Sequence, residues 1–213
     1  MPRTIIFANG LLPDLTAARR LLRPDDFILA ADGGTRHALE LGRAPNLVLG
    51  DMDSLDKADW ATLEQANVPV EIFPRDKNET DLELALGRAL EIGNQEIIIL
   101  AALGGRLDQT LANLSLLADL RPSTFDARID DGVEQAFFAR TRSQVAGRSG
   151  DIVSLIPWGG EVHITSTSGL KWPLSNEILF AHKSRGISNE MIAERAEIKI
   201  TSGLLLIVHQ RKS

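Results

Sequence analysis

The chain has 213 residues, 44% of them hydrophobic and 24% charged, which is long enough for a sizeable core and typical of a soluble globular protein. A formal net charge of −6 and a pI near 5.3 argue against a general nucleic-acid binder or a protein of anionic membrane surfaces. There is no cysteine for a disulfide or a thiolate metal site, and no apolar run long enough for a signal peptide or a membrane span, so we expect a cytoplasmic protein.

Along the first part of the chain, short apolar runs alternate with helical patterns. Unbroken runs, as expected for strands buried on both faces of a parallel sheet, occupy residues 4–8, 27–31, 47–50, 70–73, 97–102 and 125–129. Apolar residues at helical spacing mark residues 15–22, 82–90 and 107–118, and a further helix is expected through His37 and Leu41. The alternation predicts βαβ units and a doubly wound, mostly parallel, Rossmann-like sheet over residues 1–132.

From residue 133 the helical periodicity fades, and glycine, serine and threonine separate short β-prone runs. These runs occupy residues 136–139, 151–156, 161–165, 169–172, 197–201 and 204–209. Only Ser202-Gly203 separates the last two runs, which predicts a hairpin turn. Residues 133–213 are therefore predicted to form an all-β domain, either a sandwich or a barrel.

Acids and glycines follow four of the predicted strands. In an open parallel sheet, ligands bind beyond the carboxyl ends of the strands, so these residues are expected to meet at one edge. In chain order, the four strand ends carry Asp32-Gly33-Gly34, then Asp51 and Asp53, then PRDKNETD at 74–81, then Gly104-Gly105-Arg106-Leu107-Asp108-Gln109. Their convergence is a stronger indication of a ligand site than any single motif.

Two of these stretches pass from a strand through a glycine pair into a helix. Glycine lets the backbone approach a ligand closely, and a helix N-terminus offers free N–H groups and partial positive charge, which together suit phosphate. The alternative is a tight turn without a ligand. Because neither GxxxxGK[ST] nor GxGxxG is present, a P-loop and a dinucleotide fingerprint are excluded.

Asp51 and Asp53 stand one residue apart in LGDMDSL, directly after a predicted strand. In an extended chain, residues i and i+2 point to the same side, so the two carboxylates would repel each other unless a cation lay between them. Hard oxygen ligands suit Mg²⁺, which bridges a few carboxylates to substrate phosphates, and Asp81 would be a third ligand. The alternative is a surface turn in which both acids point into water.

Two helix starts carry further candidates. Thr80 and Glu83 make a capping-box pattern, which predicts Thr80 as the N-cap and Asp81 as the first helical residue. The helix dipole favours an acid there, so Asp81 has either a structural or a ligand-directed role. On the later helix, a polar stripe holds Arg106, Gln109 and Asn113. It is either a solvated face or, because Arg106 opposes the helix dipole, a face directed at phosphate.

The four histidines are scattered and do not suggest a metal site, and we treat them as ordinary structural or surface residues. Trp172 lies in the predicted β domain, where residue-level reasoning favours a core position over stacking on a flat heterocycle.

Five ordered motifs resemble the thiamine pyrophosphokinase (thiamine diphosphokinase) family over nearly the whole chain. They are Asp32-Gly33-Gly34, LGDMDS, DKNETDLELAL, LGGRLDQTLANL, and the C-terminal TSGLKWPL with GISNE. The resemblance implies an α/β ATP-binding catalytic domain followed by a thiamine-binding β-sandwich, in a homodimer with the thiamine site at its interface. It also implies Mg²⁺-dependent transfer of the pyrophosphoryl group of ATP to the hydroxyl of thiamine, giving AMP and thiamine diphosphate.

The same resemblance implies roles for individual residues. The implied catalytic and metal-binding residues are Asp51, Asp53 and Asp81. The implied ATP-binding residues are Asp32, Gly33, Gly34, Lys77, Thr80, Gly104, Gly105, Arg106, Asp108 and Gln109. The implied thiamine-binding residues are Trp172, Ser188 and Asn189. Asn78 departs from the family pattern, which has an aspartate there in many bacterial members, so one negative charge near the phosphates is missing.

In the implied reaction the thiamine hydroxyl attacks the β-phosphorus of ATP, which requires positioning and charge neutralisation more than covalent help. Asp81 is the candidate to accept the hydroxyl proton. Three alternatives stay open at this point: a pyrophosphokinase of another hydroxymethyl heterocycle such as a pterin, a nucleotide-sugar transferase that uses D-x-D with a metal, and a non-catalytic nucleotide or thiamine sensor.

Overall fold

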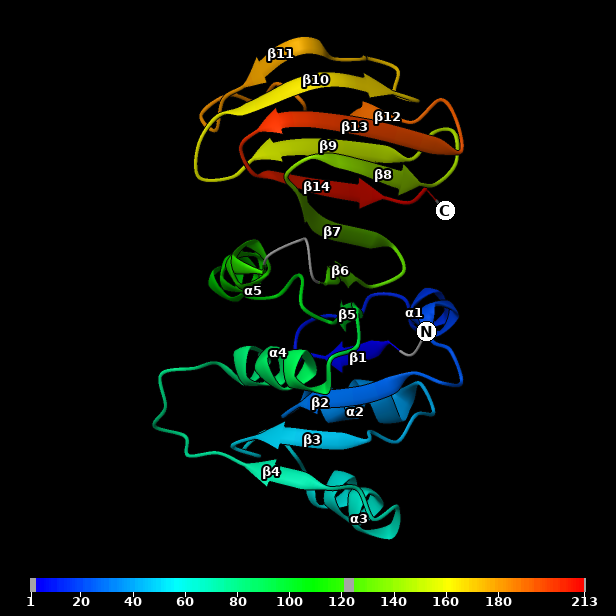
Figure 1. The fold of residues 1–213 in the computed structure, drawn as a ribbon. Coiled ribbons are helices and arrows are strands. Elements are labelled where there is room, and N and C mark those ends of the chain that lie inside the picture. The colour runs from blue at the N-terminus through cyan, green and yellow to red at the C-terminus, as the bar shows by residue number, and fades with distance from the viewer. Residues whose placement is uncertain (1–2, 121–124, 213) are drawn as a thin grey trace. The chain divides into compact units, whose positions relative to one another are not determined.

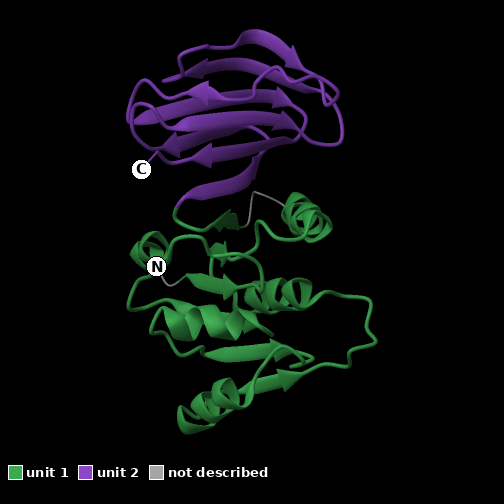
Figure 2. Cartoon of the chain, turned by 180° about the vertical axis from the view of Figure 1, so that it is seen from behind, with its two compact units in different colours: residues 1–132 green, residues 133–213 purple. Residues whose placement is uncertain are grey.

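The structure is a computed structural model that describes residues 3–120 and 125–212. The chain divides into two compact units, residues 1–132 and residues 133–213, coloured green and purple in Figure 2. Among the described residues, no helix is both long enough and apolar enough to cross a membrane.

Unit 1 is built on a parallel sheet whose strands are the predicted apolar runs (Figure 1). Its strands are β1 (Thr4–Phe7), β2 (Phe27–Ala31), β3 (Leu47–Gly50), β4 (Val70–Ile72), β5 (Glu96–Leu100) and β6 (Asp126–Asp130). They lie in the order β6-β5-β1-β2-β3-β4, and each neighbouring pair is parallel. This confirms the predicted alternating, mostly parallel sheet.

Helices connect these strands. They are α1 (Leu15–Leu21), α2 (Gly34–Glu40), α3 (Lys57–Gln65), α4 (Asp81–Ile92) and α5 (Leu107–Asp119). Thr80 caps α4 by accepting a hydrogen bond from the Glu83 backbone at 3.1 Å, as its pattern predicts. The sequence prediction missed α3, whose apolar face is narrow. A capping box between Asp56 and Asp59 starts this helix and is its clearest local signal.

The order of the strands positions the site. The chain builds β1 to β4 outward in one direction and then returns to place β5 on the other side of β1. The strand order therefore reverses between β1 and β5, and a crevice forms beyond the carboxyl ends of strands at such a point. The loops after these two strands are joined by a backbone hydrogen bond from Gly10 to Ala101 of 2.7 Å.

Unit 2 consists of two antiparallel sheets that enclose one core. The strands are β7 (Glu134–Ala139), β8 (Arg142–Ala146), β9 (Ile152–Pro157), β10 (Val162–Ser168), β11 (Ser175–Leu179), β12 (Asn189–Glu190), β13 (Arg195–Ser202) and β14 (Leu205–Gln210). One sheet runs β12-β9-β14-β7 and the other β11-β10-β13-β8. Buried residues from both sheets, among them Val153, Ile164 and Ile207, share one cluster, as in a β-sandwich.

Two local predictions for unit 2 are wrong. Ser202-Gly203 is not a hairpin turn, because β13 and β14 belong to different sheets and the dipeptide carries the chain from one sheet to the other. Residues 169–172 are not a strand, and only Leu170 makes an isolated bridge, to Met191. Gly169 has a positive φ of 73°, and a Cβ there would lie 2.0 Å from the Arg195 carbonyl oxygen, so this segment bends closely over β13.

Candidate active site

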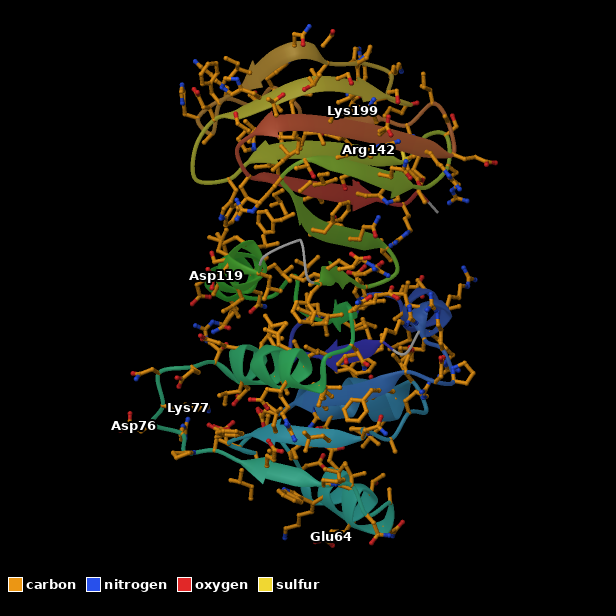
Figure 3. All side chains as sticks on the ribbon, viewed as in Figure 1. Glu64, Asp76, Lys77, Asp119, Arg142 and Lys199 are labelled. Atoms are coloured by element: carbon orange, nitrogen blue, oxygen red, sulfur yellow. The ribbon has the colours of Figure 1, made fainter. Side chains whose placement is uncertain are left out.

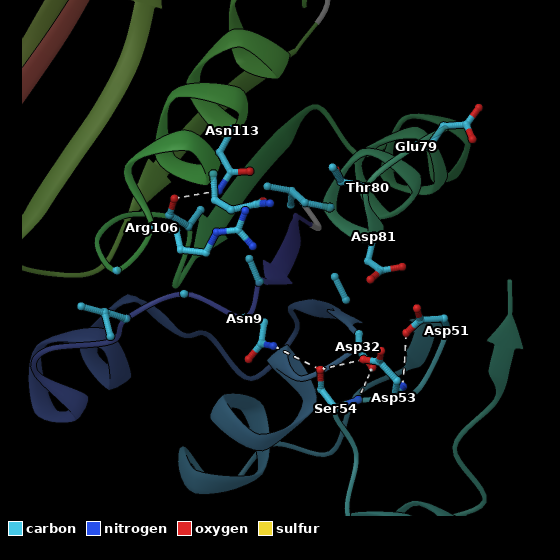
Figure 4. A pocket seen from close by; sticks show the side chains of 18 of the residues that line it. Asn9, Asp32, Asp51, Asp53, Ser54, Glu79, Thr80, Asp81, Arg106 and Asn113 are labelled. Carbon is cyan, nitrogen blue, oxygen red and sulfur yellow. Dashed lines mark hydrogen bonds between the residues drawn. The ribbon is translucent and has the colours of Figure 1, made fainter. Parts of the chain in front are cut away.

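A pocket of about 580 Å³ opens at the reversal of strand order in unit 1 (Figure 4). Its lining comes from the loops after β1, β2, β3 and β5, from the loop before α4, and from the N-terminal parts of α4 and α5. The lining residues are Ala8, Asn9, Gly10, Leu11, Ala31, Asp32, Asp51, Asp53, Ser54, Lys77, Glu79, Thr80, Asp81, Leu82, Ala102, Gly104, Gly105, Arg106, Gln109 and Asn113. The expected meeting of four strand ends at one edge is thus observed.

Three carboxylates form the acidic part of this pocket. Asp32, Asp51 and Asp53 each offer an oxygen that lies within 4.8 Å of the others. Asp32 is buried, with 4% of its surface exposed, Asp51 is half-buried, and Asp53 is exposed. The sequence prediction grouped Asp81, rather than Asp32, with the D-x-D pair. Asp32 becomes a neighbour of that pair only because β2 and β3 are adjacent in the sheet.

The backbone between Asp51 and Asp53 is not extended, so the expected same-side geometry of residues i and i+2 is wrong. Met52 has a φ of +63°, and the Asp53 backbone N–H donates to Asp51 Oδ1 at 3.2 Å. A turn, rather than an extended strand, therefore brings the two carboxylates together. Asp32, with a φ of +45°, and Ala101, with a φ of +54°, are left-handed at two further strand ends. Such backbone strain gathers at functional sites.

Asp81 lies beside the three acids and not within their group. Its Oδ1 is buried and lies 3.0 Å from Lys77 Nζ, an ion pair whose angles are outside those of a hydrogen bond. Burial raises the pKa of the Asp81 carboxyl, Lys77 lowers it, and the negative charges of Asp32 and Asp51 raise it further. Asp81 therefore holds a proton more tightly than an ordinary aspartate.

Both glycine pairs were expected to face phosphate, but only one of the two pairs lines the pocket. Gly104 and Gly105 line the pocket, both with positive φ. Gly33 and Gly34 are not among its lining residues, and their missing side chains instead serve packing. A Cβ on Gly34 would lie 2.0 Å from the Phe7 carbonyl oxygen, and one on Gly33 would lie 2.5 Å from the Asn9 side chain.

The start of α5 presents a cation to the pocket, but this cation already has a partner. The Arg106 guanidinium donates to both carboxylate oxygens of Asp108, at 3.1 and 2.6 Å, and both side chains are exposed. Asp108 itself does not line the pocket, whereas Arg106 and Gln109 do. Asn113, the third member of the predicted stripe, is buried and donates to the Ala102 carbonyl at 2.8 Å, which ties α5 to the end of β5.

Sequence reasoning missed several lining residues. Asn9 follows β1 and donates to Ser54 Oγ at 3.4 Å, and Ser54 Oγ in turn donates to Asp53 at 3.3 Å (Figure 4). Leu11 also follows β1 and lies against Gly104. Both residues could have been found by applying the strand-end rule to β1, where no acid or glycine pair drew attention.

The residues of the acidic group fit a hard divalent cation. All three ligands are carboxylate oxygens, they come from two adjacent strand ends, and their mutual repulsion is relieved when a cation lies between them. A softer metal would require imidazole or thiolate ligands, which the lining residues do not include.

In unit 2 the structure brings together the residues implied to bind thiamine. The Trp172 backbone N–H donates to Asn189 Oδ1 at 3.1 Å, and Asn189 Nδ2 donates to the Trp172 carbonyl at 2.7 Å. Ser188, with a φ of +57°, is held by a hydrogen bond from its N–H to Ser154 Oγ. Trp172 is 50% exposed, so the core position favoured by residue-level reasoning is wrong. Lys171 Nζ lies over the Trp172 ring, 5.0 Å from the ring centroid.

Both units match models of known families. Residues 18–129 match the family described as "Thiamin pyrophosphokinase, catalytic domain", and residues 141–205 match "Thiamin pyrophosphokinase, vitamin B1 binding domain". The chain is 30% identical to the thiamine pyrophosphokinase of Bacillus subtilis over 204 residues, which cover 94% of this chain and 93% of that protein.

Solved structures agree with these matches. The crystal structure of thiamine pyrophosphokinase from Bacillus subtilis has a TM-score of 0.87 and 27% identity, with all of both chains covered. That of thiamin pyrophosphokinase from Geobacillus thermodenitrificans has a TM-score of 0.82 and 30% identity, covering 100% of this chain and 99% of that one. The chain therefore belongs to the thiamine pyrophosphokinase family.

Proposed function

We propose that the protein transfers the pyrophosphoryl group of ATP to the hydroxyl of thiamine, giving AMP and thiamine diphosphate. The observation that carries this proposal is the pocket of unit 1, in which three carboxylates, two glycines at a helix start and the cations Lys77 and Arg106 converge. This set suits a nucleotide polyphosphate with a divalent cation. The membership of both units in one family supports thiamine as the acceptor.

Asp32, Asp51 and Asp53 are proposed to hold Mg²⁺, with Asp32 in the place first expected for Asp81. When bound, the ion would neutralise charge on the polyphosphate and bridge it to these carboxylates. Lys77, Arg106 and the backbone N–H groups of Gly104 and Gly105 are proposed to take up the remaining phosphate charge.

Asp81 is proposed as the group that accepts the proton of the thiamine hydroxyl. A primary hydroxyl is a weak nucleophile until it loses its proton, and a carboxylate with a raised pKa is a better acceptor than an ordinary one. Burial supplies that raised pKa, and Lys77 holds the carboxylate at the pocket wall.

Thiamine is proposed to bind through unit 2, at the exposed Trp172 ring. The two hydrogen bonds between Trp172 and Asn189 fix this segment against β12, and β12 is paired with β9 of the sandwich. A rigid, exposed aromatic ring is a suitable surface for stacking a flat heterocycle.

The first test is turnover by the purified protein with ATP, Mg²⁺ and thiamine, following AMP and thiamine diphosphate by chromatography. Asp51→Asn and Asp53→Asn should each lower kcat by about 10²-fold, because charge stabilisation at the phosphates is lost. Glu64→Gln on the exposed surface of α3 is the matched control and should behave as wild type. No turnover by the folded wild type refutes the function, and full activity of both variants refutes the metal assignment.

The raised pKa of Asp81 predicts a pH-dependent gain in stability for Asp81→Asn. Below the ordinary aspartate pKa of about 4, the carboxyl is protonated in both the folded and the unfolded state, and the variant should match wild type. As pH rises, the wild type must ionise a partly buried carboxyl, so at pH 7 without divalent cations the variant should be more stable, although inactive. Urea unfolding at both pH values measures this, and a less stable variant at pH 7 contradicts it.

Trp172→Ala should raise the KM for thiamine about five- to tenfold and leave the KM for ATP near its wild-type value, because the lost contact is aromatic. Lys199→Ala removes an exposed side chain of unit 2 that pairs with Glu197, outside the apolar set assigned to the interface, and is the control, with neither KM changed. A larger effect of Trp172→Ala on ATP than on thiamine would remove Trp172 from the thiamine site.

The protein is further proposed to be a homodimer with the thiamine site at its interface. Several large apolar side chains of unit 2 are exposed, which suits an interface: Trp172, Ile178, Phe180, Ile187 and Ile192. Sedimentation equilibrium should give twice the chain mass of 23.2 kDa. Mixing Asp51→Asn chains with Trp172→Ala chains should give more activity than the mean of the two, and a fully active monomer would contradict the proposal.

A further inference from the structure

The loop between β4 and α4 carries two cations that each contact an acid of the pocket. Arg75 Nη2 lies 3.4 Å from Asp53 Oδ2, and Lys77 Nζ lies 3.0 Å from Asp81 Oδ1. Figure 3 labels Lys77 and its neighbour Asp76 on this loop. The chain thus supplies its own positive charge to acids that a divalent cation would otherwise neutralise.

The two cations differ in how firmly they are held. The Lys77 side chain is only 12% exposed and lies i, i+4 from Asp81 across the start of α4. The Arg75 side chain is 83% exposed, and its partner Asp53 is about half exposed. An exposed ion pair of this kind contributes little stability, so Arg75 can leave Asp53 at little cost.

Arg75 contacts Oδ2 of Asp53, whose carboxylate belongs to the proposed metal site. Within residues 3–120 and 125–212, it is the one lysine or arginine within 4.0 Å of a carboxylate of Asp32, Asp51 or Asp53. A guanidinium keeps its charge in proteins, so Arg75 and a dication on the same carboxylate would repel each other. Arg75 and a divalent cation therefore compete for Asp53.

We infer that Arg75 is an exchangeable counterion, which neutralises Asp53 when no metal is bound there and binds the substrate polyphosphate when Asp53 takes up the metal. The inference rests on the proposed use of a metal-bound nucleotide polyphosphate. A metal held by Asp53 would bring a metal-bound polyphosphate close to this carboxylate, and the guanidinium fork matches phosphate oxygens as it matches a carboxylate. Once Arg75 is displaced from Asp53, its guanidinium would pair with the polyphosphate instead.

This exchange predicts effects of opposite sign in one variant. Arg75→Gln removes the competitor for Asp53, so Mg²⁺ alone should bind the nucleotide-free protein more tightly, by about two- to fivefold. The same change removes a phosphate partner, so Mg²⁺ with a non-hydrolysable ATP analogue should bind more weakly, by about three- to tenfold. AMP, which lacks the transferred phosphates, should bind unchanged.

Titration calorimetry on the full chain measures all three affinities without turnover. Arg75→Lys keeps the charge and should leave Mg²⁺ binding near wild type. Arg88→Gln is the control, because Arg88 pairs with Glu71 and Glu91, neither of which is an acid of the pocket; none of the three affinities should change.

Each outcome decides a part of the inference. Unchanged or weaker Mg²⁺ binding by Arg75→Gln overturns the competition for Asp53. Unchanged binding of the analogue, or equal losses for the analogue and AMP, overturns the transfer to the polyphosphate. Wild-type protein that binds the analogue but forms no thiamine diphosphate refutes the proposed function, while the Arg75 inference still stands or falls on these affinities.

Discussion

The repulsion among Asp32, Asp51 and Asp53, whose oxygens lie within 4.8 Å of one another, is the constraint around which unit 1 is arranged. Like charges at this separation are unfavourable unless a cation offsets them. The protein offsets them in part with Arg75 and, at the neighbouring Asp81, with Lys77. Both cations come from the loop between β4 and α4, so the chain itself neutralises part of the negative charge of these acids.

The fold holds these charges together by accepting backbone strain at the carboxyl ends of the strands. Asp32 and Ala101, directly after β2 and β5, and Met52, two residues after β3, all have positive φ. Left-handed backbone is unfavourable for such residues and persists where surrounding structure enforces it. Here the enforcing structure is the parallel sheet, together with the close packing of α2 on β1 that Gly34 permits. Stability is thus given up locally where the chemistry requires a particular geometry.

In unit 2, the exposed side chain of Trp172 is held in place by hydrogen bonds of its own backbone. The backbone around Trp172 is irregular, but both polar atoms of its peptide groups are bonded to the side chain of Asn189. Because β12 continues the sheet through β9, the ring is anchored to the sandwich while half of its residue surface stays exposed. Exposure of a large apolar side chain has a cost, which burial of the ring against a bound molecule would recover.

The sequence by itself determined the alternation of strands and helices, the all-β second half, and the strand ends where the site lies. These follow from local patterns: apolar runs, the Thr80 cap and the glycine pairs are each read within a few residues. Motif order also identified the family. Only the tertiary structure decided which side chains meet. Asp32 joins Asp51 and Asp53 because β2 and β3 are neighbours, and Ser202-Gly203 links two sheets because β13 and β14 pair elsewhere. Neither these long-range pairings nor the exposure of Trp172 is encoded in a short stretch, since both depend on residues distant in the chain.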